Sequence, residues 1–197
     1  SLALDIMKLL LVIEPGQTDW QEKMANYERE LGAINRKDFA LEQAEKDIET
    51  SIQAFEGLLE IDDSVVSWQR GLAMSQLEAA QLARMRHNFT FALELVTAAQ
   101  STLALLLEHE SSNQETKNQY TISQLVAGDI YADTSRQEAA VRYWKSALKT
   151  IEAEGAGTLS LELVDLNSTL LMRLGRSGEA DPLLTHLQAI GYQSAFE

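Results

Sequence analysis

The feature that most constrains the fold is an internal repeat. The tripeptide Ser-Gln-Leu at residues 75–77 returns at residues 123–125, an offset of 48 positions, and the same offset places Trp20 on Trp68. Along three copies, small residues fall on small residues and large apolar residues fall on large apolar ones. Such a period indicates stacked supersecondary units, each of which needs its neighbour to bury its hydrophobic face.

The units are predicted to be helical. Within each one the apolar residues are spaced three and four positions apart, which is typical of amphipathic helices and not of strands. Thr18, Ser112 and Ser135 are each followed three residues later by Gln or Glu, a pattern that fits a capping box. We expect antiparallel helix pairs over residues 18–60, 66–109, 113–154 and 159–190, and the tail of an incomplete repeat over residues 1–14.

The predicted fold is therefore all-α: an α-α superhelix, formed as one solenoid over residues 1–197 and expected to be part of a longer protein. In each pair, a small residue on the first helix precedes a small residue on the second by twelve positions. Small side chains at these places would allow the two helices to approach closely. The eight predicted packing residues are Gly32, Ala44, Ala80, Ala92, Gly128, Ala140, Ser168 and Ala180.

This pattern resembles the tetratricopeptide repeat (TPR), a pair of helices with small residues where they touch. The best match is the third copy, with Gly128 and Tyr131 followed by Ala140, Trp144 and Ala147. The TPR unit has about 34 residues, whereas three copies here are 48 positions apart. The surplus implies longer second helices and longer connections.

In TPR arrays the first helices line a concave surface, so the resemblance implies a groove that binds a protein or peptide. Its expected lining residues are Asn26, Arg29, Arg36, Met74, Leu77, Gln81, Arg84, Ile122, Leu125 and Asp129. This groove would be basic at its N-terminal end, apolar in the middle and acidic at the far end. The alternative is that the four apolar residues of this set belong to the core. This would be the case if the assignment of residues to the groove face were shifted by one position along each helix.

Residues 11–21 and their echo at 59–69 resemble repeat arrays attached to bacterial signalling proteins, such as serine/threonine kinases and transcription regulators. The resemblance implies a regulatory or sensory scaffold that binds a peptide or a partner helix. The alternative is a structural spacer, or a segment that forms a homodimer through open array ends. The sequence leaves two alternatives for the location of the protein: the cytoplasm, or an exported domain of a membrane-anchored protein.

Composition argues against several classes of function. A formal net charge of −14 argues against nucleic-acid binding, and the lack of cysteine excludes disulfides and thiolate metal sites. The sequence has no glycine-rich phosphate motif and no metal-binding spacing among its three histidines, so we expect no enzyme, catalytic residue, metal or cofactor. The apolar stretch Leu9 to Ile13 is too short to span a bilayer, so no membrane insertion is expected.

Overall fold

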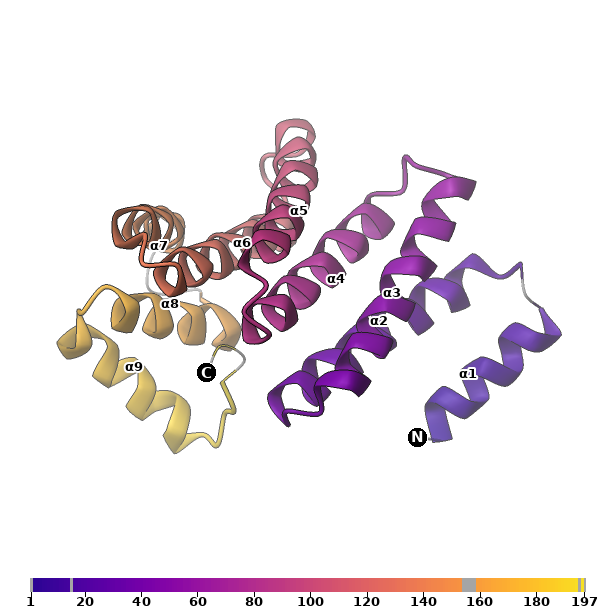
Figure 1. Ribbon diagram of the computed structural model, residues 1–197, viewed down its shortest axis with the longest axis horizontal. Coiled ribbons are helices and arrows are strands. Elements are labelled where there is room, and N and C mark those ends of the chain that lie inside the picture. Colours follow the sequence, from indigo (N-terminus) through magenta and orange to yellow (C-terminus); the bar gives the residue numbers. More distant parts are fainter. Residues whose placement is uncertain (1, 15, 154–158, 195, 197) are drawn as a thin grey trace. The chain divides into compact units, whose positions relative to one another are not determined.

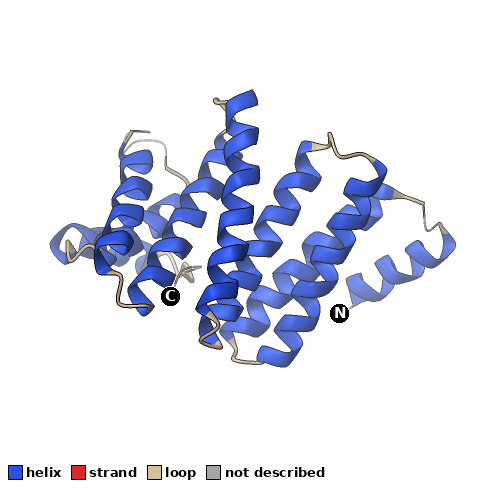
Figure 2. Ribbon diagram, turned by 45° about the horizontal axis from the view of Figure 1, so that its top comes forward, coloured by secondary structure: helices blue, strands red, loops and turns tan. Residues whose placement is uncertain are grey.

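The computed structural model describes residues 2–14, 16–153, 159–194 and 196. Over these residues it contains nine helices and no strand (Figures 1 and 2). The helices are α1 (Leu2–Ile13), α2 (Thr18–Lys37), α3 (Leu41–Ile61), α4 (Val66–Met85), α5 (Phe89–His109), α6 (Gln114–Asp133), α7 (Gln137–Glu152), α8 (Leu161–Arg173) and α9 (Ser177–Ala189). The expected end of the third pair at residue 154 lies outside the described residues.

The chain forms two compact units, Ser1–Ser112 and Asn113–Glu197. In the first unit α2 pairs with α3 and α4 with α5; in the second, α6 pairs with α7 and α8 with α9. Within each unit, the first helix of the second pair contacts both helices of the first pair: α4 contacts α2 and α3, and α8 contacts α6 and α7. Consecutive hairpins stacked in this way make an α-α superhelix, so the predicted fold class is confirmed.

The first helix of the chain occupies the place of a second helix in the repeat. Helices α1, α3 and α5 end at Ile13, Ile61 and His109, which are 48 positions apart. The helices that follow start after N-cap residues with similar extended backbones, with φ of −79°, −74° and −69°. Helix α1 contacts α2 as α3 contacts α4, so this connection between pairs recurs within the first unit.

The same turn closes all four helix pairs. Its central residue has a left-handed backbone and is Phe39, His87, Ser135 or Gly175, with φ of 59°, 59°, 60° and 72°. The next residue donates its N–H to the carbonyl five positions back, as from Ala40 to Asn35 at 2.8 Å and from Asn88 to Ala83 at 2.8 Å. This is the Schellman motif, which satisfies carbonyls left open at a helix end.

The predicted capping boxes are wrong. Ser135 lies in the left-handed turn, and the N-cap residues of α2 and α7 are Gln17 and Arg136, whose side chains make no capping hydrogen bond. At the Ser112 box the cap is Asn113 instead, and its side-chain oxygen accepts from the Thr116 N–H at 2.9 Å. Of these three helices, α6 is therefore capped by a side chain and α7 follows the left-handed turn at Ser135.

The eight predicted packing residues are all buried. A Cβ added to Gly32 would lie 2.5 Å from Cγ1 of Ile48 and 3.3 Å from the carbonyl oxygen of Ala44, and one added to Gly128 would collide with the indole ring of Trp144. Glycine therefore allows α2 to approach α3, and α6 to approach α7, more closely than any side chain would permit. A third close approach, Gly71 on α4 against the ring of Phe55 on α3, joins successive pairs.

One described helix, α5, is long and apolar enough to cross a membrane when judged by length and composition alone. Its buried residues, Ala92, Val96, Ala99, Leu103 and Leu106, recur every three or four positions, and the helix packs against α4. That one-sided pattern is typical of a helix in a packed hairpin. The expected lack of membrane insertion stays a prediction.

Candidate functional site

Half of the residues predicted to line the TPR-type groove are not available to a partner. Arg36, Leu77, Ile122, Leu125 and Asp129 have exposed fractions between 1% and 8%. The structure leaves the other five, Asn26, Arg29, Met74, Gln81 and Arg84, partly exposed. The alternative interpretation, that apolar residues of this set belong to the core, holds for Leu77, Ile122 and Leu125.

Arg36 holds two neighbouring first helices together. Its Nε and Nη2 donate to Oε2 of Glu78 at 3.1 and 2.9 Å, from α2 to α4. The two side chains are 9% and 14% exposed. Arg36 therefore does not form the open basic end of the predicted groove, because Glu78 of α4 already supplies its carboxylate.

Asp129 has the matching role in the second unit. Its Oδ1 accepts from Nε1 of Trp144 at 3.1 Å and from Nε of Arg173 at 3.0 Å, and its Oδ2 accepts from Nη2 of Arg173 at 3.1 Å. The hydrogen bond with Asp129 raises the pKa of Arg173 above its ordinary value. Asp129 therefore joins α6, α7 and α8 and does not form the acidic end of a groove.

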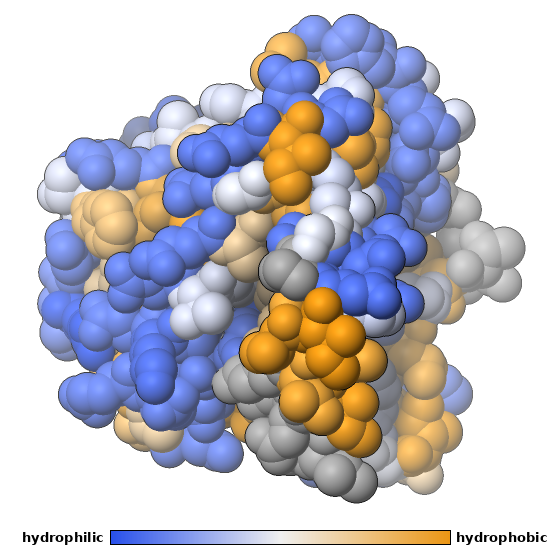
Figure 3. Space-filling model, turned by 90° about the vertical axis from the view of Figure 1, so that its right-hand side faces the viewer, coloured by the Kyte–Doolittle hydropathy of each residue, from blue (hydrophilic) through white to orange (hydrophobic). Residues whose placement is uncertain are grey.

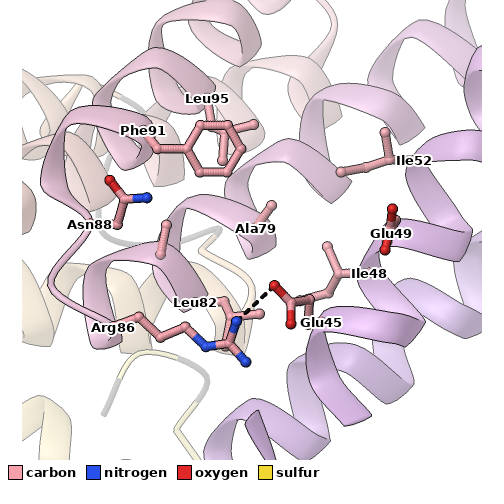
Figure 4. Close-up of a pocket in the computed structure, with 11 residues that line it drawn as sticks. Glu45, Ile48, Glu49, Ile52, Ala79, Leu82, Arg86, Asn88, Phe91 and Leu95 are labelled. Atoms are coloured by element: carbon pink, nitrogen blue, oxygen red, sulfur yellow. Dashed lines mark hydrogen bonds and ion pairs between the residues drawn. The ribbon is translucent and has the colours of Figure 1, made fainter. Parts of the chain in front are cut away.

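The structure offers a different site, a cavity of about 530 Å³ among α3, α4 and α5 in the first unit (Figure 4). Its apolar walls come from successive turns of two second helices: Ile48 and Ile52 on α3, Phe91 and Leu95 on α5. Leu82 and Ala79 of α4 lie between these walls (Figure 4), and Ala83 of the same helix also lines the cavity. The remaining lining residues are Glu45, Glu49, Arg86 and Asn88.

The cavity exists because α4 presents small side chains between two helices with larger ones. Ala79 packs partly buried against the core cluster of Ala44, Ile48 and Leu82. The Phe91 ring points into the space between α3 and α5, yet 49% of the residue is exposed. An aromatic side chain beside an apolar hollow is the kind of surface that proteins use for binding.

Polar groups border one side of this cavity. Nη1 of Arg86 lies 2.7 Å from Oε1 of Glu45, and the two side chains are 33% and 55% exposed. Glu49 lies one turn after Glu45 on α3, is exposed, and accepts a hydrogen bond from Gln53 at 3.3 Å. The site thus combines an apolar interior with two carboxylates and one guanidinium at its edge.

Sequence reasoning missed this cavity because it placed the partner on the first helices. One signal was present: Phe91 directly precedes Ala92, a buried packing residue, and therefore stands off the buried stripe of α5. That position put a large aromatic side chain outside the part of α5 that packs the core.

A second, smaller cavity of about 300 Å³ lies among α1, α2 and α3. Its lining residues are Leu11, Gln21, Met24, Gln53, Ala54, Gly57 and Ile61. No charged side chain lines it, so it offers less means of selecting a partner than the cavity beside Phe91.

Among the residues that the structure describes, no three His, Asp or Glu side chains lie together as a metal site would require. Asp62 is exposed and accepts hydrogen bonds from the N–H and hydroxyl of Ser64 at 2.9 and 2.6 Å, which lower its pKa. This carboxylate stabilises a turn and is not suited to hold a proton near neutral pH.

No protein-family model matches this sequence, and no significant match to a curated protein was found.

Proposed function

We propose that this protein is an interaction scaffold of TPR-like helix pairs, acting as a regulatory or sensory region without enzyme activity, cofactor or nucleic-acid partner. The observation that carries the proposal is the apolar cavity among α3, α4 and α5, with the half-exposed Phe91 at its edge. When an aromatic side chain of this size is buried in an interface, it typically contributes a large share of the binding energy of the two proteins. We therefore propose this cavity, in place of the groove on the first helices, as the surface that contacts the partner.

The repeat architecture favours binding over catalysis. Stacked helix pairs present long, rigid surfaces, and rigid elements hold a contact site in place before the partner arrives. The likeness to bacterial signalling proteins rests on residues 11–21 and 59–69. It supports a role in which the chain conveys the presence of a partner to other parts of a larger protein.

A specific observation favours self-association as a second candidate function. Helix α1 exposes Ile6, Leu9, Val12 and Ile13, with exposed fractions of 48%, 60%, 78% and 65%. An apolar patch is visible on the side of the molecule that carries α1 (Figure 3). A second copy of the chain covering this patch would give the homodimer that the sequence alternative describes.

The test is affinity purification of the tagged full chain from cells that naturally contain it. We expect a partner protein that is lost with Phe91→Asp and kept with Leu105→Asp, since Leu105 is exposed at 57% on the same helix but does not line the cavity. Equal recovery from both variants contradicts the proposal. The milder Phe91→Ser variant and a melting curve of each protein show whether a loss reflects binding or misfolding.

A second experiment separates the two candidate functions. Copies of the chain with two different tags are mixed, and their association is measured with Val12→Glu as the variant. Association that Val12→Glu abolishes and Phe91→Asp leaves intact supports the self-association function.

A further inference from the structure

The helices that form the walls of the Phe91 cavity are strongly acidic. Helix α3 carries six acidic residues and one lysine, a net charge of −5, and α5 carries two acidic residues and neither Lys nor Arg, a net charge of −2. Helix α4, which lies between them, carries Arg70, Glu78 and Arg84, a net charge of +1, so the three helices together carry −6. A partner that reaches the cavity therefore approaches through a negative potential, which favours cationic groups.

The carboxylates nearest the cavity are placed to receive such groups. Glu45 and Glu49 lie one helical turn apart on α3, and both line the cavity. Arg86 pairs with Glu45 through an exposed ion pair, and exposed pairs of this kind contribute about 0–1 kcal/mol and exchange readily. A cation from a partner can therefore pair with Glu49, or compete with Arg86 for Glu45, at little cost.

The apolar walls have the spacing of helical neighbours. Ile48 and Ile52 are four residues apart on α3, and Phe91 and Leu95 are four residues apart on α5, so two short apolar ridges face each other across the hollow. A groove between two helices accepts the apolar face of a third, whose anchors recur at i, i+3, i+4 and i+7. The volume of about 530 Å³ has room for large aliphatic side chains.

We infer that the cavity binds a basic amphipathic helix of a partner protein. Its aliphatic side chains enter between Ile52 and Phe91, and its Lys or Arg side chains meet Glu45 and Glu49. This inference rests on the proposed interaction function and adds the chemical class of the partner. A partner segment that is acidic is excluded by this inference.

The test uses three synthetic helical peptides of equal length and the full chain. The first has Leu on one face and Lys on the other; the second has Glu in place of Lys; the third keeps Lys but has Ser in place of Leu. Binding is followed by fluorescence anisotropy of the labelled peptide. We expect the Leu/Lys peptide to bind at least about tenfold more tightly than either of the others.

Matched variants separate a local contact from general attraction to an acidic protein. Glu49→Lys should weaken binding of the Leu/Lys peptide by about tenfold, while Glu108→Lys, with the same charge change at the far end of α5, should weaken it by less than about twofold. Phe91→Asp should also weaken it by about tenfold, and Leu105→Asp should not.

The outcomes distinguish this inference from the function on which it rests. Equal effects of Glu49→Lys and Glu108→Lys, or equal binding of the Leu/Lys and Leu/Glu peptides, overturn the inference of a basic partner. If the Leu/Glu peptide binds and Phe91→Asp abolishes its binding, the cavity remains the contact site. If no peptide binds, the inference of a basic helix is wrong. The interaction function is then tested separately by the purification experiment with Phe91→Asp.

Discussion

At the scale of single residues, glycine has opposite effects at two helical positions. A Cβ on Gly128 would collide with the Trp144 ring, whereas one on Gly57 would have no atom within 4 Å. We expect Gly57→Ala to raise the free energy of unfolding by about 0.5–1 kcal/mol, through helix propensity. Gly128→Ala should lower it by about 1–3 kcal/mol, through overpacking. Urea unfolding measures both, and a gain in both variants contradicts the packing role of Gly128.

The left-handed turn at Phe39 gives a second prediction at this scale. Phe39 has φ of 59° and is 77% exposed, so its side chain contributes little packing while its backbone is strained. Phe39→Gly should raise the free energy of unfolding by about 1 kcal/mol, because a left-handed backbone costs other residues about 1–2 kcal/mol. Asp38→Gly is the control: φ there is −79°, so glycine should destabilise. Stabilisation by both variants would exclude turn strain as the cause.

At the scale of helices, the ion pair between α2 and α4 gives a third prediction. Glu78→Ala leaves the buried Arg36 without the carboxylate it meets at 2.9 Å, and we expect it to lower the free energy of unfolding by about 3–5 kcal/mol. Glu45→Ala breaks the exposed pair with Arg86 and should cost less than about 1 kcal/mol. Chemical denaturation of both variants checks this contrast. Similar decreases in the free energy of unfolding for the two variants would mean that the buried Arg36–Glu78 pair stabilises the fold no more than the exposed pair does.

The helix pairs could be predicted from the sequence because their signals are local and recur. Apolar spacing and recurring small residues placed those boundaries of the pairs that fall on described residues within about two residues of the observed helix ends. The turns could not be predicted, because two of the four left-handed positions are Phe39 and His87. Neither residue favours that backbone as glycine does. Tertiary packing imposes the turn at those positions. In the same turn of the third pair, Ser135 occupies the left-handed position, although its sequence context is typical of an N-cap.

The binding site was harder to predict because it depends on contacts between pairs. Arg36 can either line an open groove or pair with Glu78, and the distance between α2 and α4 decides which. The spacing of residues along the sequence does not reveal that distance. The Phe91 cavity likewise gathers residues from three helices, separated by up to 50 positions. Phe91 lies outside the buried stripe of α5, but so does Leu105, which does not line the cavity, so this signal alone could not locate the site.

At the scale of the whole molecule, the charge of −14 gives a fourth prediction. Repulsion among excess carboxylates destabilises the folded chain, and salt screens it, since the Debye length falls from about 30 Å at 0.01 M to about 10 Å at 0.1 M. We expect the melting temperature to rise over this range of sodium chloride. A fall would show that favourable ion pairs, such as Arg36 with Glu78, outweigh the net repulsion.

The central claim is that the chain contacts another protein through the cavity beside Phe91. The most direct measurement is photo-crosslinking of the full chain in its native cells, with benzoylphenylalanine in place of Phe91 or, as control, of the exposed Leu105. The claim predicts a covalent adduct with another protein from position 91 and none from position 105. Adducts of equal yield from both positions, or from neither, would contradict it.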